Sequence, residues 1–366
     1  MVFPVVGGDG KPTGYDIDNS LRFEDGDAPR LTKTFSSSGN RRTVTFSAWF
    51  KLSNLGIIRH IFSNNGADFI NLESDDTLSV QLAGSAEGYL YSNRVFRDSS
   101  AWYHIVVAVD TTQGTASNRL KLYINGVQET SFSATSNPNQ NLETGFAENV
   151  QHAIGMRSAN VDRHFDGYLA EVNFVDGSAL DPTYFGETDN NGVWIPKKPN
   201  VSSYGTNGFY MQFQQTGTSA NSSGIGADTS GNDHHFAVTN LAATDVTTDT
   251  PTNNFATVNS LTETQGVIDF SEGNTQIAGN TSTQGSARSS IQIPPSGKWY
   301  IESEFDAIGG SGSSAFAFVP ENYTSHALNA TGARGVAGSY SNAASSRVLQ
   351  LINATSQIGS NINVSA

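Results

Sequence analysis

Paired carboxylates are the side chains whose spacing would matter most, because two acids on one strand face can flank a glycosidic bond and cleave it. The segment Glu302-Ser303-Glu304-Phe305-Asp306 sets three acids at alternate positions, and alternate residues of a strand share a face. Glu171 stands alone in its own predicted strand. We expect the acids of residues 302–306 to form a solvated strand face rather than a catalytic pair.

Other catalytic chemistry finds no support in the sequence. There is no G-x-S-x-G motif to present a nucleophilic serine. The glycine-rich residues 308–312 lack the lysine of a phosphate-binding loop. None of the seven histidines has the H-x-x-x-H spacing of a zinc site. The sequence therefore predicts a protein that is not an enzyme.

Carboxylates in predicted loops could instead hold calcium, which takes several oxygen ligands from Asp, Asn and backbone carbonyls. The candidate ligands are the loop aspartates Asp25, Asp27, Asp68, Asp75, Asp76 and Asp166. The alternative is ordinary turn chemistry, because Asp before Gly is a turn signal in its own right. Calcium is the one cofactor that we consider, and the sequence defines no full ligand set for it.

Glycan recognition needs an exposed aromatic ring for the apolar face of a sugar, and amide or charged partners for its hydroxyls. Trp49 lies among polar side chains on one face of its segment, and Tyr89 and Tyr91 lie near Asn93 and Arg94. These five residues are the glycan-binding candidates. For Trp49 the alternative is that it covers a second layer, since both faces of its sheet can be buried.

The elements that must position these residues are strands. Apolar side chains recur at every second position in several segments, and this period is typical of a strand with one buried face. The segments are 43–52, 102–110, 119–124 and 167–175. Residues 102–110 are apolar on both faces, which predicts a central strand. Asn125-Gly126 predicts a two-residue hairpin turn.

Helices contribute little to the predicted fold. Leu180 to Gly186 predicts one short helical turn, with Asp181 as its cap and Pro182 at its first position. The sequence contains no long amphipathic helix. Many short strands separated by turn residues indicate an all-β fold, a sandwich or jelly roll.

The chain divides into three predicted parts. Residues 1–187 form the jelly roll, and residues 188–260, rich in Gly, Asn and Thr, form an ordered but irregular connector with short strands. Residues 261–366 form a second β-sandwich, with alternation in residues 298–305. About a hundred residues is short for such a sandwich. We therefore expect this part to be incomplete, or to be completed by strands of a partner chain.

Charge and composition exclude several classes of protein. Lys and Arg number 20 against 34 Asp and Glu, giving a formal charge of −14, so we expect binding neither to nucleic acid nor to an anionic membrane. No apolar run approaches the roughly 20 residues of a membrane span, and the N-terminus lacks the features of a signal peptide. The absence of cysteine excludes a disulfide scaffold.

Several strings together resemble one family of domains. They are Ser20–Phe23, Gly39–Trp49, Ala116–Val127, Phe165–Val172 and Ala179–Pro182. As a set they resemble the concanavalin A-like, laminin-G-like jelly-roll domains of tailed-phage structural proteins, especially those of marine phages. Tyr204–Tyr210 and Asp228–Asp233 resemble the segment that follows this domain in the same proteins. Gly297–Glu302 resembles the opening of a SPRY-like sandwich.

The resemblance implies a virion protein, made in the cytoplasm of a bacterial host, that serves as a tail fibre or another host-facing appendage. Its implied partners are other virion proteins, further copies of itself (a trimer being favoured) and a glycan of the host surface. A purely structural decoration or shaft subunit is the alternative. A glycan depolymerase is less favoured, because related glucanases carry an E-x-D-x-x-E strand and Glu302–Asp306 departs from that pattern.

Overall fold

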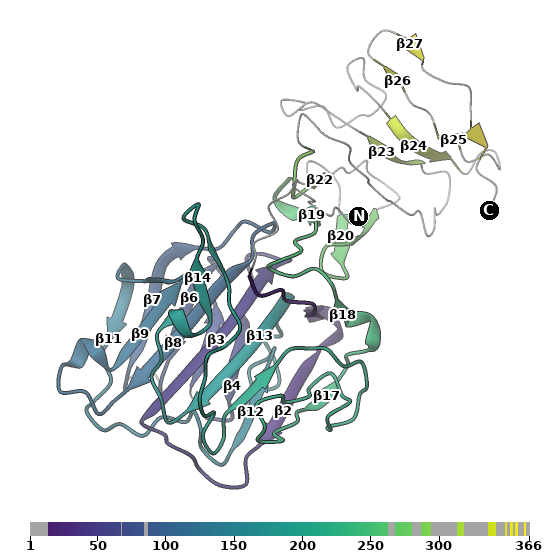
Figure 1. The fold of residues 1–366 in the computed structure, drawn as a ribbon. Helices are drawn as coiled ribbons and strands as arrows, with labels where there is room; N and C mark the ends of the chain where they lie inside the picture. The colour runs from purple at the N-terminus through teal and green to yellow at the C-terminus, as the bar shows by residue number, and fades with distance from the viewer. Residues whose placement is uncertain are drawn as a thin grey trace. The chain divides into compact units, whose positions relative to one another are not determined.

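The computed structural model describes residues 14–66, 68–83, 87–262, 268–279 and 287–293, and the short segments 313–317, 336–341, 348–349, 352–353, 356–357 and 362–363 (Figure 1). The chain divides into two compact units. The described part of the first unit is residues 14–257 with Glu272–Asn274, and the second unit holds the other described residues beyond 257.

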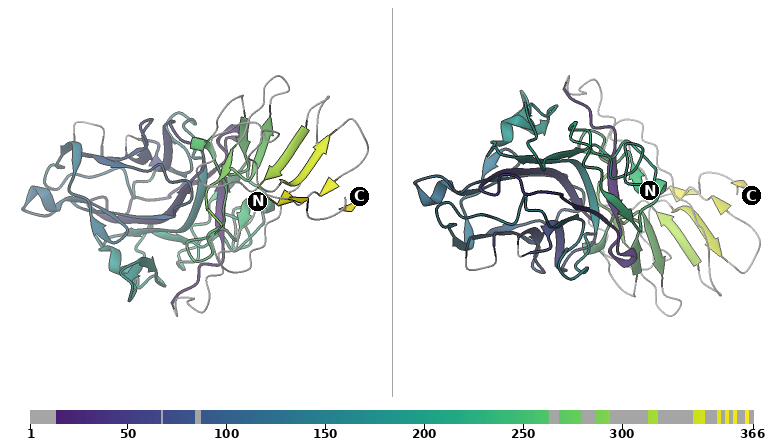
Figure 2. Two further views of the ribbon diagram at one scale, coloured as in Figure 1. Left: turned by 90° about the horizontal axis from the view of Figure 1, so that it is seen from above. Right: turned by 90° about the horizontal axis from the view of Figure 1, so that it is seen from below.

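Two eight-stranded sheets lie face to face and form the first unit (Figures 1 and 2). Sheet A has the order β10 (Val127–Gln128), β9 (Leu120–Ile124), β8 (Tyr103–Asp110), β3 (Thr43–Leu52), β13 (Gly167–Asp176), β1 (Ser20–Phe23) and β18 (Val246–Thr247), and β16 (Phe209–Met211) also pairs with β13. Sheet B has the order β11 (Phe132–Ser136), β7 (Tyr89–Val95), β6 (Thr77–Gln81), β5 (Phe69–Leu72), β4 (Arg59–Asn64), β12 (Gln151–Ile154), β2 (Arg30–Thr34) and β17 (Ala237–Thr239).

Short elements complete this unit. A two-stranded sheet joins β14 (Gly186–Thr188) to β15 (Trp194–Pro196), and 3-10 turns lie at Asp25–Asp27, Ala116–Asn118, Pro182–Tyr184 and Ala243–Asp245. The side chain of Asp181 accepts a hydrogen bond from the Thr183 amide, and Pro182 begins the turn, which confirms the predicted helical turn. Among the described residues, no helix has the length and apolar character that a membrane span requires.

Inward-facing side chains of both sheets form one hydrophobic core. The ring of Phe62 on β4 lies near its centre, stacked on Phe46 with ring centroids 5.0 Å apart and on Phe146 at 5.3 Å. The apolar residues at alternate positions of β3, from Val44 to Leu52, all belong to this core, as the period-two pattern of residues 43–52 predicts. The all-β jelly-roll sandwich predicted from the sequence is therefore confirmed.

The predicted connector requires a correction. Residues 188–257 belong to the first unit, and β16, β17 and β18 extend its two sheets by pairing with β13, β2 and β1. This segment packs on the first unit because it contains short runs of apolar residues. Phe209, Met211 and Phe236 enter the same core as the earlier strands, so the segment completes the sandwich instead of linking two domains.

The second unit is described as short antiparallel strands. They are β19 (Val258–Asn259) with β22 (Arg288–Ser289), β20 (Ile268–Ser271) with β21 (Gln276–Gly279), β26 (Ile352–Asn353) with β27 (Ser356–Gln357), and the set β23 (Ser313–Ala317), β24 (Val336–Ser341), β25 (Val348–Leu349) and β28 (Ile362–Asn363). A 3-10 turn lies at Ser260–Thr262. The predicted strand 298–305, with Glu302 and Glu304, lies outside the described residues. The SPRY-like sandwich stays a prediction.

The hairpin turn between β9 and β10 gives a test of the fold. Asn125 and Gly126 have φ values of 47° and 80°, as a type I′ turn requires, and a Cβ on Gly126 would lie 2.3 Å from the Trp194 ring. We expect Gly126→Ala to lower the free energy of unfolding by about 1–3 kcal/mol, measured by urea denaturation. Gly114→Ala is the matched control, because a Cβ added to Gly114 would have no other atom within 4 Å. Equal stability of the two variants would contradict this account of the turn.

Candidate functional site

The outward face of sheet A is covered by other segments of the chain. Trp49 is only 4% exposed and forms a small cluster with Ile17 and Ala170, against which Tyr15 and Trp194 pack. The ring of His104 stacks on Trp49 at 4.8 Å, and Trp194 Nε1 donates to His104 Nδ1 at 3.1 Å. Trp49 therefore covers a second layer, the alternative that the sequence left open, and presents no free ring face to a sugar.

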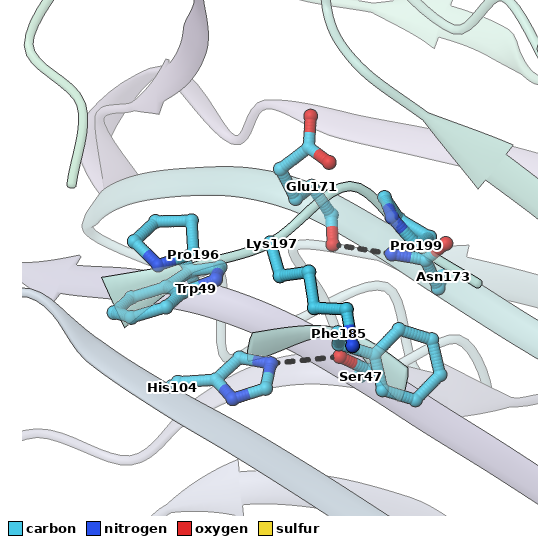
Figure 3. A pocket seen from close by; sticks show the side chains of 9 residues that line it. All are labelled: Ser47, Trp49, His104, Glu171, Asn173, Phe185, Pro196, Lys197 and Pro199. Atoms are coloured by element: carbon cyan, nitrogen blue, oxygen red, sulfur yellow. Dashed lines mark hydrogen bonds between the residues drawn. The ribbon is translucent and has the colours of Figure 1, made fainter. Parts of the chain in front are cut away.

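A narrow crevice on this covered face is closely filled by side chains (Figure 3). Its lining residues are Ser47, Trp49, His104, Glu171, Asn173, Phe185, Pro196, Lys197 and Pro199. Figure 3 shows the carboxylate of Glu171 turned away from the other lining side chains. Glu171 is the one acid among these nine residues, so the crevice offers no carboxylate pair for glycoside hydrolysis.

Glu171 nevertheless has unusual surroundings. It lies where the pairing of β13 with β3 shifts register between Ala170 and Asn173, and its φ of 51° is in the left-handed region. Its carboxylate accepts hydrogen bonds from the hydroxyls of Tyr15 and Tyr210. Burial raises the pKa of Glu171 to about 7, and these two hydrogen bonds oppose that rise. The β-bulge thus interrupts the alternation of β13 and places the carboxylate of Glu171 between the side chains of Tyr15 and Tyr210.

A cluster of three acids lies elsewhere in the same unit. Single carboxylate oxygens of Glu24, Asp25 and Asp166 all lie within 4.8 Å of one another. Glu24 and Asp25 follow β1, and Asp166 precedes β13; Leu21, Arg22 and Phe23 of β1 pair with residues 167–169 of β13, which brings the two acidic ends together. Burial, and then repulsion from Glu24 and Asp25, raises the pKa of Asp166 well above its ordinary value.

This acid cluster fits a hard cation such as calcium, because its donors are carboxylate oxygens that repel one another without a counter-charge. The Asp166 carboxylate accepts weak hydrogen bonds from the amides of Asn54 and Asp25 at 3.3 and 3.5 Å, and the Arg59 guanidinium opposes the rise in its pKa. The sequence-based candidates included Asp25 and Asp166 but not Glu24, which directly precedes Asp25, because only aspartates were considered as ligands.

The other predicted calcium ligands lie apart from this cluster. Asp68 is buried, and its carboxylate accepts hydrogen bonds from the amides of Ala83, Gly145 and Phe146 at 2.5–3.0 Å, so it holds loops together. Asp27 is not among the clustered acids. The remaining two pair locally: Asp75 accepts from Thr77 within its own turn, and Asp76 accepts from Arg59 and Arg97.

The outward face of sheet B carries the other predicted aromatics. Tyr89 and Tyr91 are partly exposed on β7, with ring centroids 5.6 Å apart in an edge-to-face arrangement. Both alternate with Leu90, which enters the core, so both point away from it. Their partners on the edge strand β11 are the small residues Ser136 and Ala134.

Polar groups lie beside these rings. Across the sheet, Tyr89 pairs with Gln81 and Gln81 with Phe69, while Tyr91 pairs with Ser79. Glu73 follows β5, accepts a hydrogen bond from Ser79 Oγ at 2.7 Å, and contributes with burial to the raised pKa of Tyr91. We call the partly exposed residues Phe69, Glu73, Gln81, Tyr89 and Tyr91 the tyrosine strip.

The two tyrosines of the tyrosine strip were predicted from the sequence as glycan-binding candidates, but its other three residues were not. Alternation within residues 69–73 predicts that Phe69 and Glu73 share one face of a strand. That Gln81 and the two tyrosines share this face depends on the pairing of β5, β6 and β7, which the sequence pattern does not predict. The candidates Asn93 and Arg94 are exposed but engaged, since Asn93 donates to Ser131 at 2.9 Å and Arg94 pairs with Glu129 at 3.0 Å.

An open depression of about 510 Å³ lies at one rim of the sandwich, lined by Ser38, Gly39, Asn40, Arg41, Arg42 and Glu143. Its arginines are already paired, because Arg42 contacts Glu143 at 3.0 Å and Arg41 contacts Glu148 at 3.2 Å. No aromatic side chain lines it. The depression can form polar contacts but offers no ring for a sugar to stack on.

Comparison with known proteins agrees with this fold. Residues 25–183 match the family model of the Concanavalin A-like lectin/glucanases superfamily, so this part of the chain is a concanavalin A-like, laminin G-like domain. No curated protein matches the chain.

Three solved structures illustrate the range of similar folds. A heptameric SAP-like pentraxin from Limulus polyphemus has 18% identity and a TM-score of 0.34, with 46% of this chain and 80% of that chain covered. A candidate carbohydrate-binding protein from Bacteroides ovatus has 14% identity and a TM-score of 0.41, with coverage of 65% and 62%. Domains LG4-5 of the mouse laminin alpha1 chain have 12% identity and a TM-score of 0.32, with coverage of 56% and 49%. The alignment thus spans less than two thirds of the second and third proteins.

Neutralising Glu171 should change how stability depends on pH. Burial raises its folded pKa to about 7 from an ordinary 4.5, so its stabilising contribution is full below about pH 4.5 and is lost as the pH rises through 7. Relative to Glu171→Gln, the wild type should lose up to about 1.4 kcal/mol per pH unit across this window. Urea denaturation of both proteins from pH 4.5 to 8 measures the difference, and parallel curves would refute the raised pKa.

Calcium should stabilise the wild type through the acid cluster. We expect the wild type to melt at a higher temperature with calcium than with a chelator, and Asp166→Asn to lose this dependence. In chelator the variant should itself melt higher, by about 2–4 °C for each kcal/mol of relieved repulsion, because the raised folded pKa of Asp166 makes its charge destabilising at neutral pH.

Asp27→Asn is the matched control for this calcium experiment, since Asp27 lies in the same turn but outside the cluster. It should keep the calcium dependence of the wild type. Melting temperatures that calcium leaves unchanged in all three proteins would exclude a cation at the acid cluster.

Proposed function

We propose that this protein binds glycans through the tyrosine strip, without cleaving them, and that it does so as a tail fibre or another host-facing appendage of a phage virion. The observation that carries the proposal is that partly exposed aromatic rings lie beside carboxylate and amide groups on the outward face of sheet B. Rings accept the apolar face of a sugar, and groups such as Glu73 and Gln81 accept or donate to its hydroxyls.

The contrast between the two outward faces supports this location. On sheet A, the aromatic and acidic side chains around Trp49 and Glu171 are buried beneath the chain's own segments. On sheet B, Tyr89 and Tyr91 keep part of their surface exposed to solvent. The family match to lectins and glucanases agrees with sugar binding as a class, and the residues that line the described crevice do not supply the two acids of a hydrolase.

The virion role rests on the resemblance of the sequence strings to tailed-phage structural proteins. An appendage that displays several copies, as a trimer would, converts weak single-site binding into strong attachment. The formal charge of −14 would keep such a particle soluble and limit nonspecific adhesion to polyanions. Other virion proteins are the proposed permanent partners, and a glycan of the host surface is the proposed transient one.

A glycan array tests the site. We expect the wild type to bind a defined subset of glycans, Tyr91→Ala and Tyr89→Ala to lose about tenfold or more in affinity, and Tyr91→Phe to retain most of it. The reason is that the ring supplies the apolar contact, and Phe preserves the ring; stacking of a nucleobase on an aromatic side chain, which is worth roughly 1–3 kcal/mol, sets the scale.

Tyr123→Ala on β9 is the matched control, because this tyrosine is also partly exposed but lies in sheet A. A blank array would favour the alternative of a purely structural virion subunit. Binding that survives Tyr89→Ala and Tyr91→Ala but is lost in Arg41→Ala would move the site to the rim depression. Release of reducing sugar by the wild type would show cleavage and overturn the proposal of binding alone.

A further inference from the structure

Lys51 is a fully buried lysine on the covered face of sheet A. Its Nζ donates to three oxygens: Asp249 Oδ2 at 2.9 Å, Asn254 Oδ1 at 2.9 Å and the Phe255 carbonyl at 2.6 Å. A buried charge normally requires such partners. What sets this site apart is that the lysine meets a carboxylate and a side-chain amide at the same time.

The two acceptor side chains are fixed from their other ends. Asp249 Oδ1 accepts hydrogen bonds from Trp102 Nε1 and from the Phe255 amide, both at 3.2 Å. Asn254 Nδ2 donates to the Ser100 carbonyl at 2.7 Å, which settles which end of the amide faces Lys51. The amine, the amide and the acid are thus held in one arrangement before any reaction.

The surroundings act on the charge of the amine in opposite directions. The ring of Tyr168, 5.7 Å from Lys51 Nζ, and the three acceptor oxygens favour the charged form. Burial lowers the pKa of Lys51, while attraction to Asp249 opposes that effect. A neutral lysine amine is a competent nucleophile, and a neighbouring carboxyl group can carry its proton.

We propose that Lys51 and Asn254 form an intramolecular amide bond, with Asp249 transferring the protons. The contacts that carry the proposal are the 2.9 Å approaches of Nζ to the amide oxygen of Asn254 and to the carboxylate of Asp249.

The reaction balances without an oxidant or a co-reactant. Lys51 Nζ gives one proton to Asp249, and its freed electron pair forms a bond to Cγ of Asn254. Asp249 passes that proton to Nδ2, and then takes a second proton from the attacking nitrogen and passes it to Nδ2 in turn. The bond from Cγ to Nδ2 breaks, and the leaving nitrogen departs as ammonium with the two protons that the lysine gave up. One ammonium side chain and one carboxamide thereby give one secondary amide and one ammonium ion.

The bond would join two distant parts of the first unit. Lys51 lies on β3 and Asn254 follows β18, and 203 positions separate them in the sequence. The segment that contains Asp249 and Asn254 would then be covalently held on the covered face of sheet A. Such a closure restricts the unfolded chain as a disulfide does, in a protein that has no cysteine.

Mass spectrometry of the denatured wild-type protein tests the proposal. We expect the intact mass to fall below the sequence mass by about 17 Da, the mass of the ammonia lost in the amide-forming step. Tandem spectra of a digest should show one peptide containing Lys51 linked to one containing Asn254. This distinguishes a cross-link from a cyclised asparagine, which loses the same mass within one peptide.

Two results would overturn the proposal. A full-length mass equal to the sequence mass, in fresh and in stored protein, would show that the contact is an ion pair with no covalent bond. A loss of about 18 Da with Lys51 linked to Asp249 would assign the wrong partner, since a carboxyl group loses water instead of ammonia.

Variants sharpen the measurement. Lys51→Arg and Asp249→Asn should both restore the full sequence mass, the first by removing the nucleophile and the second by removing the proton carrier. Lys121→Arg on β9 should keep the loss, because that lysine belongs to no such cluster. Since the decisive observation is made on the wild type, a variant that fails to fold does not weaken the test.

Discussion

Both faces of the central strands of sheet A are buried, and the polar residues on the outward face must therefore find partners within the chain. Lys51, Ser47 and Thr45 lie on that face of β3 with at most 1% of their surface exposed. Ser47 pairs with His104, and Thr45 donates to the Ser178 carbonyl. Because an unpaired buried polar group is costly, the segments that supply these partners are as necessary to the fold as the core itself.

This requirement explains why the sandwich needs residues far beyond its last central strand. Residues 180–206 cover one part of the outward face, and the segment around Asp249 covers another by pairing with Lys51 and Trp102. The covered face cannot be a binding surface at the same time. The proposed glycan contact therefore lies on sheet B, where the edge strand β11 carries small side chains beside Tyr89 and Tyr91.

The period-two pattern predicted the strands closely, because alternation is a local property of the chain. β3 has the predicted bounds, and the turn at Asn125 and Gly126 has the predicted geometry. The pattern could not show that the polar face of β3 is covered, because the partners of its side chains lie 57 to 204 positions away in the sequence. Nor could it show that residues 188–257 complete both sheets, since the short strands β16, β17 and β18 gain their stability from neighbours that the local sequence does not reveal.

The candidate sites follow the same rule. Asp25 and Asp166 were identifiable as loop acids, but their meeting with Glu24 depends on the pairing of β1 with β13. Tyr89 and Tyr91 were identifiable as aromatics beside polar residues, but Gln81 and Glu73 join them through the order of β5, β6 and β7. Trp49, by contrast, lies among polar residues in the sequence, as an exposed ring would. It is nevertheless buried, because Ile17 and Trp194, which are distant in the sequence, pack against it.

Hydroxyl-radical footprinting of the folded protein tests the central claim most directly, because it reports the solvent exposure of each aromatic side chain. The claim is that sheet A is closed by the chain's own segments and sheet B is open at the tyrosine strip. We expect oxidation of Tyr89 and Tyr91 to proceed several times faster than that of Trp49 and Tyr210, which are 4% and 9% exposed. Oxidation of Trp49 as rapid as that of Tyr91 would contradict the account, since it would place the open face on the other sheet.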